Sequence, residues 1–85
     1  MISIKDIKIL TLLTHNERTN PYKAASVSDI VDFYEQVNST ISLPTIRRSI
    51  AKLLAEGYIK EGFKRGKTKM YYISDSGLEL LSSVK

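Results

Sequence analysis

The sequence predicts a mainly α-helical fold that carries one small β-hairpin, and three observations support this. Apolar residues recur at helical spacing over residues 4–14, 29–37 and 42–56. A polar turn at 64–68 separates two short runs that favour β-strands. The chain has 85 residues and no cysteine, so we expect one domain over 1–85 that is stabilised by packing rather than by disulfides.

The first helix is expected over 4–14, where Ser3 and Asp6 form a capping arrangement at its start. Its apolar residues cover more of the circumference than one core face needs. They are Ile2, Ile4, Ile7, Ile9, Leu10, Leu12 and Leu13. Two explanations stay open: part of this surface faces a partner subunit, or the helix lies at the centre of a bundle formed by its own chain.

A polar loop follows at 15–25, and it leads into a second helix. We expect a brief strand at Ser26 and Val27. We then expect Ser28 to cap a helix over 29–37, whose apolar residues recur at helical spacing.

The third helix, 42–56, carries Pro44 in its first turn, where a missing amide hydrogen costs nothing, and it ends at a left-handed Gly57. On a helical wheel one side is apolar and is expected in the core: Ile46, Ile50, Leu53 and Leu54. The opposite side combines short side chains with long basic ones: Thr45, Arg48, Ala51, Lys52 and Ala55, with Arg47 on its flank. Such a face can press close to DNA without steric conflict.

A β-hairpin with Gly66 near its tip is expected to begin at Tyr58, and a short last helix follows it. Strand alternation predicts that Tyr71 and Ile73 point inward, whereas Met70 and Tyr72 point outward. Two helices, a turn, a third helix and a basic hairpin make a winged helix-turn-helix. This fold has a three-helix core, a two- or three-stranded wing sheet and a short C-terminal helix.

Positive charge is concentrated on residues 41–73. This segment holds eight Lys and Arg residues against two Glu, a net of +6, whereas the whole chain carries +4. A concentrated basic face attracts a polyanion by releasing counterions, and a groove-sized helix beside it indicates duplex DNA. A solvated lysine-rich surface would have the same composition, so charge alone leaves both explanations open.

The segment TIRRSIAKLLAEGYI, followed by a basic hairpin and YYISDSGLELL, resembles the core of winged-helix transcriptional regulators of the MarR-like and PadR-like groups. The resemblance covers roughly residues 26–81, and it implies that helix 42–56 enters the major groove while wing 63–70 lies on the DNA backbone or in the minor groove. It implies major-groove contacts from Thr45, Arg48, Ser49 and Lys52, and phosphate or minor-groove contacts from Lys64, Arg65, Lys67 and Lys69.

Arg48 is the first candidate for reading a base, because an arginine on an exposed helix face can make a bidentate contact to guanine. Arg47 lies nearer the core edge, so a phosphate contact or a surface ion pair is expected there. Lysines on the wing tip act as point charges, which position the protein on DNA without specifying a sequence.

The expected function is sequence-specific binding of double-stranded DNA by a small transcriptional regulator. Two alternatives remain: a winged helix that docks onto another protein, and a DNA-binding factor for replication or partition. A protein-docking version would need an exposed apolar patch and would not need basic side chains gathered on one side.

Catalysis is not expected, because the only histidine, His15, lacks paired carboxylates and no base is placed to activate a serine. No metal or cofactor is expected either. The chain has no run of about 18 apolar residues, so we expect no membrane span and a cytoplasmic protein. A homodimer would use the first and last helices, through Ile2, Ile9, Leu12, Leu78, Leu81 and Val84; a monomer on one half-site is the alternative.

Overall fold

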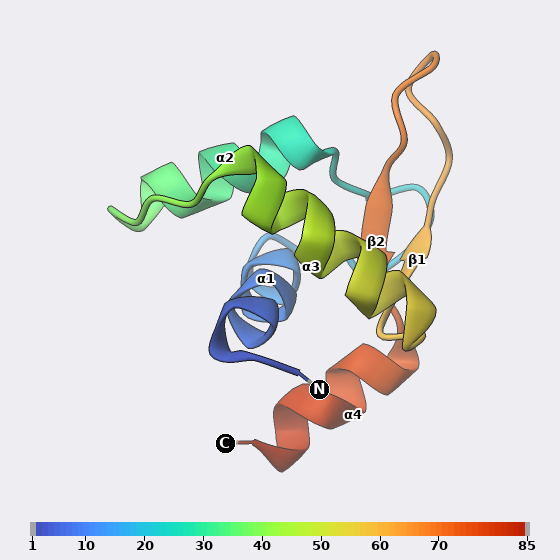
Figure 1. The fold of residues 1–85 in the computed structure, drawn as a ribbon. Coiled ribbons are helices and arrows are strands. Elements are labelled where there is room, and N and C mark those ends of the chain that lie inside the picture. The colour runs from blue at the N-terminus through green and yellow to red at the C-terminus, as the bar shows by residue number, and fades with distance from the viewer. Residues whose placement is uncertain (1, 85) are drawn as a thin grey trace.

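The computed structural model describes residues 2–84, whose helices pack around α1 (Figure 1). Helix α1 (Ile4–His15) contacts α2 (Val27–Gln36), α3 (Leu43–Ala55), α4 (Asp75–Ser83) and the hairpin strand that follows the wing. In Figure 1 the wing projects away from the helices, and α3 runs beside α1. The winged-helix fold expected from the sequence is therefore confirmed.

The apolar surplus of α1 is used mainly inside its own chain. Four of its side chains are at most 5% exposed and belong to the core: Ile9, Leu10, Leu12 and Leu13. Ile4 differs, since it is 87% exposed. For the buried four, the position of α1 at the centre of the bundle explains the apolar pattern without a partner subunit.

Each helix begins at a serine, and the cap of α2 corrects one expectation. Ser26, not Ser28, caps this helix: its hydroxyl accepts a hydrogen bond from the Asp29 amide at 3.1 Å, and the Asp29 carboxylate accepts one from the Ser26 amide at 3.0 Å. The predicted strand at Ser26 and Val27 is also wrong. The reciprocal pair satisfies two amides that would otherwise be unpaired at the helix start, which favours the earlier beginning.

The extended backbone lies one residue earlier, at Ala25. Its amide and carbonyl both bond to Tyr71, at 2.7 and 2.8 Å. Tyr71 begins β2 (Tyr71–Ile73), which pairs with β1 (Ile59–Glu61) in an antiparallel two-stranded sheet. Ala25 thus pairs with the edge of β2 that does not face β1, and this single-residue bridge anchors the start of α2 to the hairpin.

The two positions of β2 expected to point inward do so: Tyr71 and Ile73 are 8% and 1% exposed. Tyr72, expected to point outward, is half-buried. Met70, which precedes the strand, was also expected to point outward but is only 4% exposed. Met70 pairs with Gly62 through a backbone bond of 2.8 Å, and paired residues share a face of the sheet. The loop before α2 packs against that face, because a Cβ on Gly62 would lie 2.7 Å from the Ala24 side chain, so the same loop covers Met70.

Helix α4 sits tightly against the base of the hairpin. A Cβ on Gly77 would collide with the carbonyl of Tyr58 and would lie 2.6 Å from Cγ1 of Ile73. The Ser74 hydroxyl donates to the carbonyl of Gly57 at 2.6 Å, and Gly57 has the expected left-handed φ of 79°. The end of α3, the hairpin and α4 are therefore held in one unit.

Candidate nucleic-acid interface

Helix α3 presents a face of small residues between two arginines. Ser42 caps the helix and Pro44 lies in its first turn, both as expected. Ile46, Ile50 and Leu53 are buried in the core, while Leu54 is half-buried. The exposed positions are Leu43, Pro44, Arg47, Arg48, Ala51 and Ala55. The first turn of α3 carries no acidic residue, so no carboxylate there would repel a phosphate.

The exposed face is rotated relative to the expected one, toward Arg47 and away from Lys52. Ser49, expected at the DNA surface, is only 6% exposed and counts among the buried residues of α3. Lys52 is half-buried, and its Nζ lies 2.6 Å from Oδ2 of Asp6 in α1. Helix α1 covers this flank of α3, so Ser49 is buried and the Lys52 ammonium is held beside the Asp6 carboxylate.

Asp6 is a fully buried carboxylate, at 0% exposure, that links the start of α1 to α3. It accepts a hydrogen bond from the Ser3 amide at 2.8 Å in addition to the Lys52 contact, while its Oδ1 is buried without a well-formed bond among the described residues. Burial raises the pKa of Asp6, but Lys52, the Ser3 amide and the hydroxyls of Ser49 and Ser3 together outweigh it. The pKa is therefore lowered from 3.8, and the group is charged near neutral pH.

The wing carries its cations on a well-formed hairpin tip. Arg65 and Thr68 exchange two backbone hydrogen bonds, of 3.2 and 3.0 Å, around Gly66, which has a φ of 63°. All three wing lysines are exposed: Lys64, Lys67 and Lys69. Arg65 instead leans on α2, with its Nη2 3.4 Å from Oδ2 of Asp29.

Cations from α3 and the wing face one groove. It has a volume of about 870 Å³ and runs between the start of α2, the start of α3 and the wing. Its basic lining residues are Arg47, Lys67 and Lys69. The sequence pattern placed Arg47 at the core edge, but the structure exposes it and brings it to the same groove as the two wing lysines.

The base of the wing is braced by a loop and by an aromatic pair. The hairpin register shifts by one residue between the Glu61–Tyr71 pair and the Arg65–Thr68 bridge, which places an extra residue in the first arm. At this bulge the Phe63 amide donates to the carbonyl of Pro21 at 3.0 Å, and the Phe63 ring lies 4.8 Å from that of Tyr22. These contacts fix the direction of the wing relative to the helices.

The residues expected to form a homodimer surface are mostly used in the core. Ile9, Leu12 and Leu81 are at most 9% exposed, and Ile2 and Leu78 pack against the same cluster. Val84 remains 54% exposed beside a shallow groove of about 370 Å³ between α1 and α4. The apolar surface that the sequence offered for pairing is thus much smaller than its pattern suggested.

The described part of the chain contains no group of three or more His, Cys, Asp or Glu residues that could hold a metal ion. Among the same residues, no helix has the length and apolar character needed to span a bilayer. What the structure does gather is positive charge, on α3 and the wing.

Comparison with known proteins identifies similar chains. No protein-family model matches. The DNA-binding protein TubR of Clostridium botulinum C phage is 35% identical over 83 residues, which cover 98% of this chain and 96% of the relative. The fold is similar to that of TubR from Bacillus megaterium pBM400, with a TM-score of 0.81 and 26% identity over 98% of this chain and 86% of that one.

A solution structure of the DNA-binding TubR fragment from Clostridium botulinum is also similar, with a TM-score of 0.75 and 33% identity over 100% of this chain and 99% of the fragment. These matches agree with the winged-helix fold. They give no support to a closer tie with the MarR-like or PadR-like groups.

Proposed function

The chain belongs to the TubR family of DNA-binding proteins, and we propose that it binds double-stranded DNA with the exposed face of α3 and the wing. The observation that carries this proposal is the shared groove: Arg47 from α3 and Lys67 and Lys69 from the wing face the same space. Three cations from two elements suit a phosphate backbone, whose contacts fix the position of a protein on duplex DNA.

Individual roles follow from exposure and from side-chain chemistry. Arg48 is exposed on α3 and is the proposed base reader, with Thr45 beside it at the start of the helix. Arg47 and the wing lysines are proposed phosphate contacts. Arg65 is paired with Asp29 at 3.4 Å, and an ion pair near the surface is weak. A DNA phosphate can therefore replace Asp29, which makes Arg65 a further proposed phosphate contact. Ser49 and Lys52 are left out of the proposed contacts because Ser49 is buried and Lys52 is paired with Asp6.

We further propose that DNA binding serves partition of the DNA element rather than control of transcription. A replication or partition factor was one of the alternatives open from the sequence, and membership of the TubR family favours it over a transcriptional regulator. The exposed basic groove fits either role, so the support for partition comes from family membership alone.

A salt titration of duplex binding tests the DNA-binding proposal. The double variant Lys67→Gln, Lys69→Gln should bind with a smaller salt slope, which is the fall of log K with log[salt]. The slope should decrease by about 1.8, because each lost phosphate contact removes about 0.9. Arg48→Ala should cost about 1 to 3 kcal/mol at one base pair and relax the preference there. Absence of binding to any duplex at low salt would favour the protein-docking alternative.

Selection of bound duplexes from a randomised DNA pool also shows how many copies of the chain bind one site. An enriched inverted repeat would require a homodimer, whereas a single half-site fits a monomer. To separate partition from regulation, the selected sequence is cloned into an unstable plasmid. Improved plasmid retention that depends on this protein would support partition; a change in transcript level alone would support regulation.

A further inference from the structure

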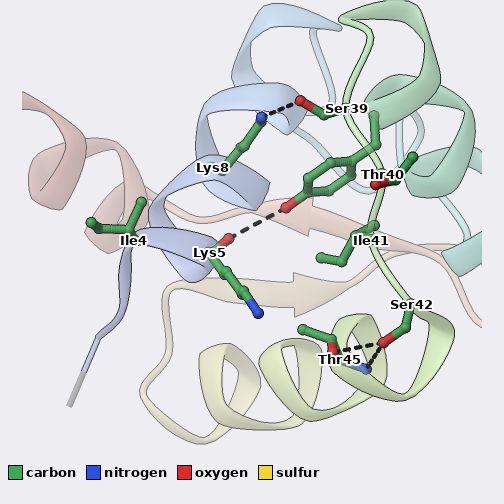
Figure 2. A pocket seen from close by; sticks show the side chains of 9 residues that line it. Ile4, Lys5, Lys8, Ser39, Thr40, Ile41, Ser42 and Thr45 are labelled. Atoms are coloured by element: carbon green, nitrogen blue, oxygen red, sulfur yellow. Dashed lines mark hydrogen bonds between the residues drawn. The ribbon is translucent and has the colours of Figure 1, made fainter.

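Two exposed aromatic rings lie at the base of the wing, where it meets the loop that precedes α2. Tyr22 and Phe63 are 85% and 61% exposed, and their ring centres are 4.8 Å apart. Every other aromatic side chain within residues 2–84 is buried or half-buried. Tyr34, for example, lies in the groove shown in Figure 2, but it is only 3% exposed and its hydroxyl bonds to the Lys5 carbonyl. The aromatic pair of Tyr22 and Phe63 is thus an exception to the burial of aromatic rings in this fold.

The backbone that carries the aromatic pair is already fixed. The side-chain carbonyl of Asn20 accepts hydrogen bonds from the amides of Tyr22 and Lys23, each at 2.9 Å. The Phe63 amide donates to the Pro21 carbonyl at 3.0 Å, which ties the base of the wing to this loop. A ligand of the aromatic pair therefore does not need to order the backbone that presents the rings, so less conformational entropy is lost on binding.

The aromatic pair faces away from the groove proposed for DNA. Gly62 pairs with Met70 in the hairpin, and a Cβ on Gly62 would lie 2.7 Å from the Ala24 side chain. The loop that carries Tyr22 therefore covers this face of the hairpin. Successive residues of a strand point to opposite faces, so Tyr71 faces the other way, where it lines the groove proposed for DNA. Neither ring of the aromatic pair lines that groove.

Two lysines give this face of the hairpin a positive charge. Lys23 follows the first ring in the chain, and Lys60 lies two residues before Gly62, so it shares the face that the loop covers. Both lysines are exposed, and within the part of the chain that the structure describes neither forms an ion pair. Glu61 lies between Lys60 and Gly62 and pairs with Tyr71, so it belongs to the opposite face.

We propose that the aromatic pair docks a peptide segment of a partner protein, in which an aromatic or aliphatic anchor lies between acidic residues. Aromatic side chains dominate the binding energy of many protein interfaces, because they supply a large apolar contact. The two lysines favour acidic neighbours of the anchor by charge complementarity. This site goes beyond DNA binding, because it attaches a protein to the face of the hairpin that the DNA groove leaves free.

The test is selection of short peptides from a random displayed library on the immobilised full chain, followed by fluorescence anisotropy of the enriched peptides. We expect enriched sequences that carry an apolar anchor among Asp and Glu residues. Tyr22→Ser should weaken their binding about thirtyfold, the effect of losing a dominant aromatic contact. The double variant Lys23→Gln, Lys60→Gln should weaken it several-fold, and less so at high salt. Val84→Ser is the matched control, because Val84 is 54% exposed but lies on α4.

Duplex DNA separates this site from the groove proposed for DNA. The enriched peptides should bind the free and the duplex-bound protein equally, and Tyr22→Ser should leave duplex affinity unchanged. Peptides that duplex DNA displaces, or a weaker duplex affinity of Tyr22→Ser, would overturn the proposal in favour of a DNA contact. A change of oligomeric state in Tyr22→Ser would assign the rings to a second copy of this chain instead.

The peptide selection also decides the proposal independently of DNA binding, because it uses the protein without DNA. No enrichment, enrichment of peptides without acidic residues, or equal binding to Tyr22→Ser and wild type would each overturn it. Failure of duplex binding with peptide binding intact would overturn the proposed DNA-binding surface alone.

Discussion

Removing either partner of the ion pair between Asp6 of α1 and Lys52 of α3 is expected to destabilise the fold, but by different amounts. Asp6 is 0% exposed, whereas the Lys52 side chain is 37% exposed. After Asp6→Asn, the lysine can turn its ammonium toward water. After Lys52→Met, the carboxylate stays buried without its cation. We therefore expect Lys52→Met to cost more than Asp6→Asn.

The magnitudes follow from the contacts that are lost. A hydrogen bond to a charged group contributes about 1.5 to 3 kcal/mol, so Asp6→Asn, which weakens the 2.6 Å contact to Lys52 but keeps an acceptor for the Ser3 amide, should cost about 2 kcal/mol. Stranding a buried charge costs about 3 to 5 kcal/mol, which is the range expected for Lys52→Met. The double variant should cost less than the sum, because no unpaired charge remains.

The assay is urea unfolding of the four proteins, followed by circular dichroism and analysed as a double-mutant cycle. Losses below about 1 kcal/mol in both single variants would show that the pair behaves as a surface ion pair and would refute the reasoning. An Asp6→Asn loss larger than that of Lys52→Met would refute the asymmetry. In that case the buried carboxylate would have found another partner.

Three further outcomes are expected. Since the pKa of Asp6 is lowered below 3.8 in the folded protein, the stability it contributes should be present above that value and should disappear as the pH falls through the folded pKa, which acid unfolding of wild type and Asp6→Asn would measure. Gly77→Ala should cost about 1 to 3 kcal/mol in urea unfolding, because the added methyl collides with the Tyr58 carbonyl; a neutral effect would mean that α4 can shift. Ser26→Ala should lower the melting temperature through the loss of about 1 kcal/mol of capping energy, whereas Ser28→Ala should leave it nearly unchanged, and equal effects would contradict the assigned cap.

The elements of this fold were predictable because their signals are local. Serine caps, helical spacing and the left-handed Gly57 each depend on a few neighbouring residues, and each gave the right element. The start of α2 was wrong by two residues because Ser26 and Ser28 are both capable of capping. The capping-box spacing from Ser26 to Asp29 was the signal that distinguishes them.

The candidate site was less predictable, because a helical wheel says nothing about what covers each flank. The wheel placed Lys52 opposite the core, yet its partner Asp6 lies 46 residues earlier in the chain and on another helix. The same limitation applies to Ser49, which was expected at the DNA surface but is only 6% exposed.

Counting charges along the sequence therefore gives the amount of positive charge but not where it lies on the folded protein. Of the cations in segment 41–73, Lys52 is committed to a buried carboxylate and adds little to the field at the surface, whereas Arg65 sits in an exposed pair that DNA can replace. Lys5 and Lys8 lie outside the segment in sequence, but in the folded protein they line a groove together with the start of α3. The salt slope of DNA binding therefore depends on which cations remain exposed beside α3, and the net charge of the segment alone does not fix it.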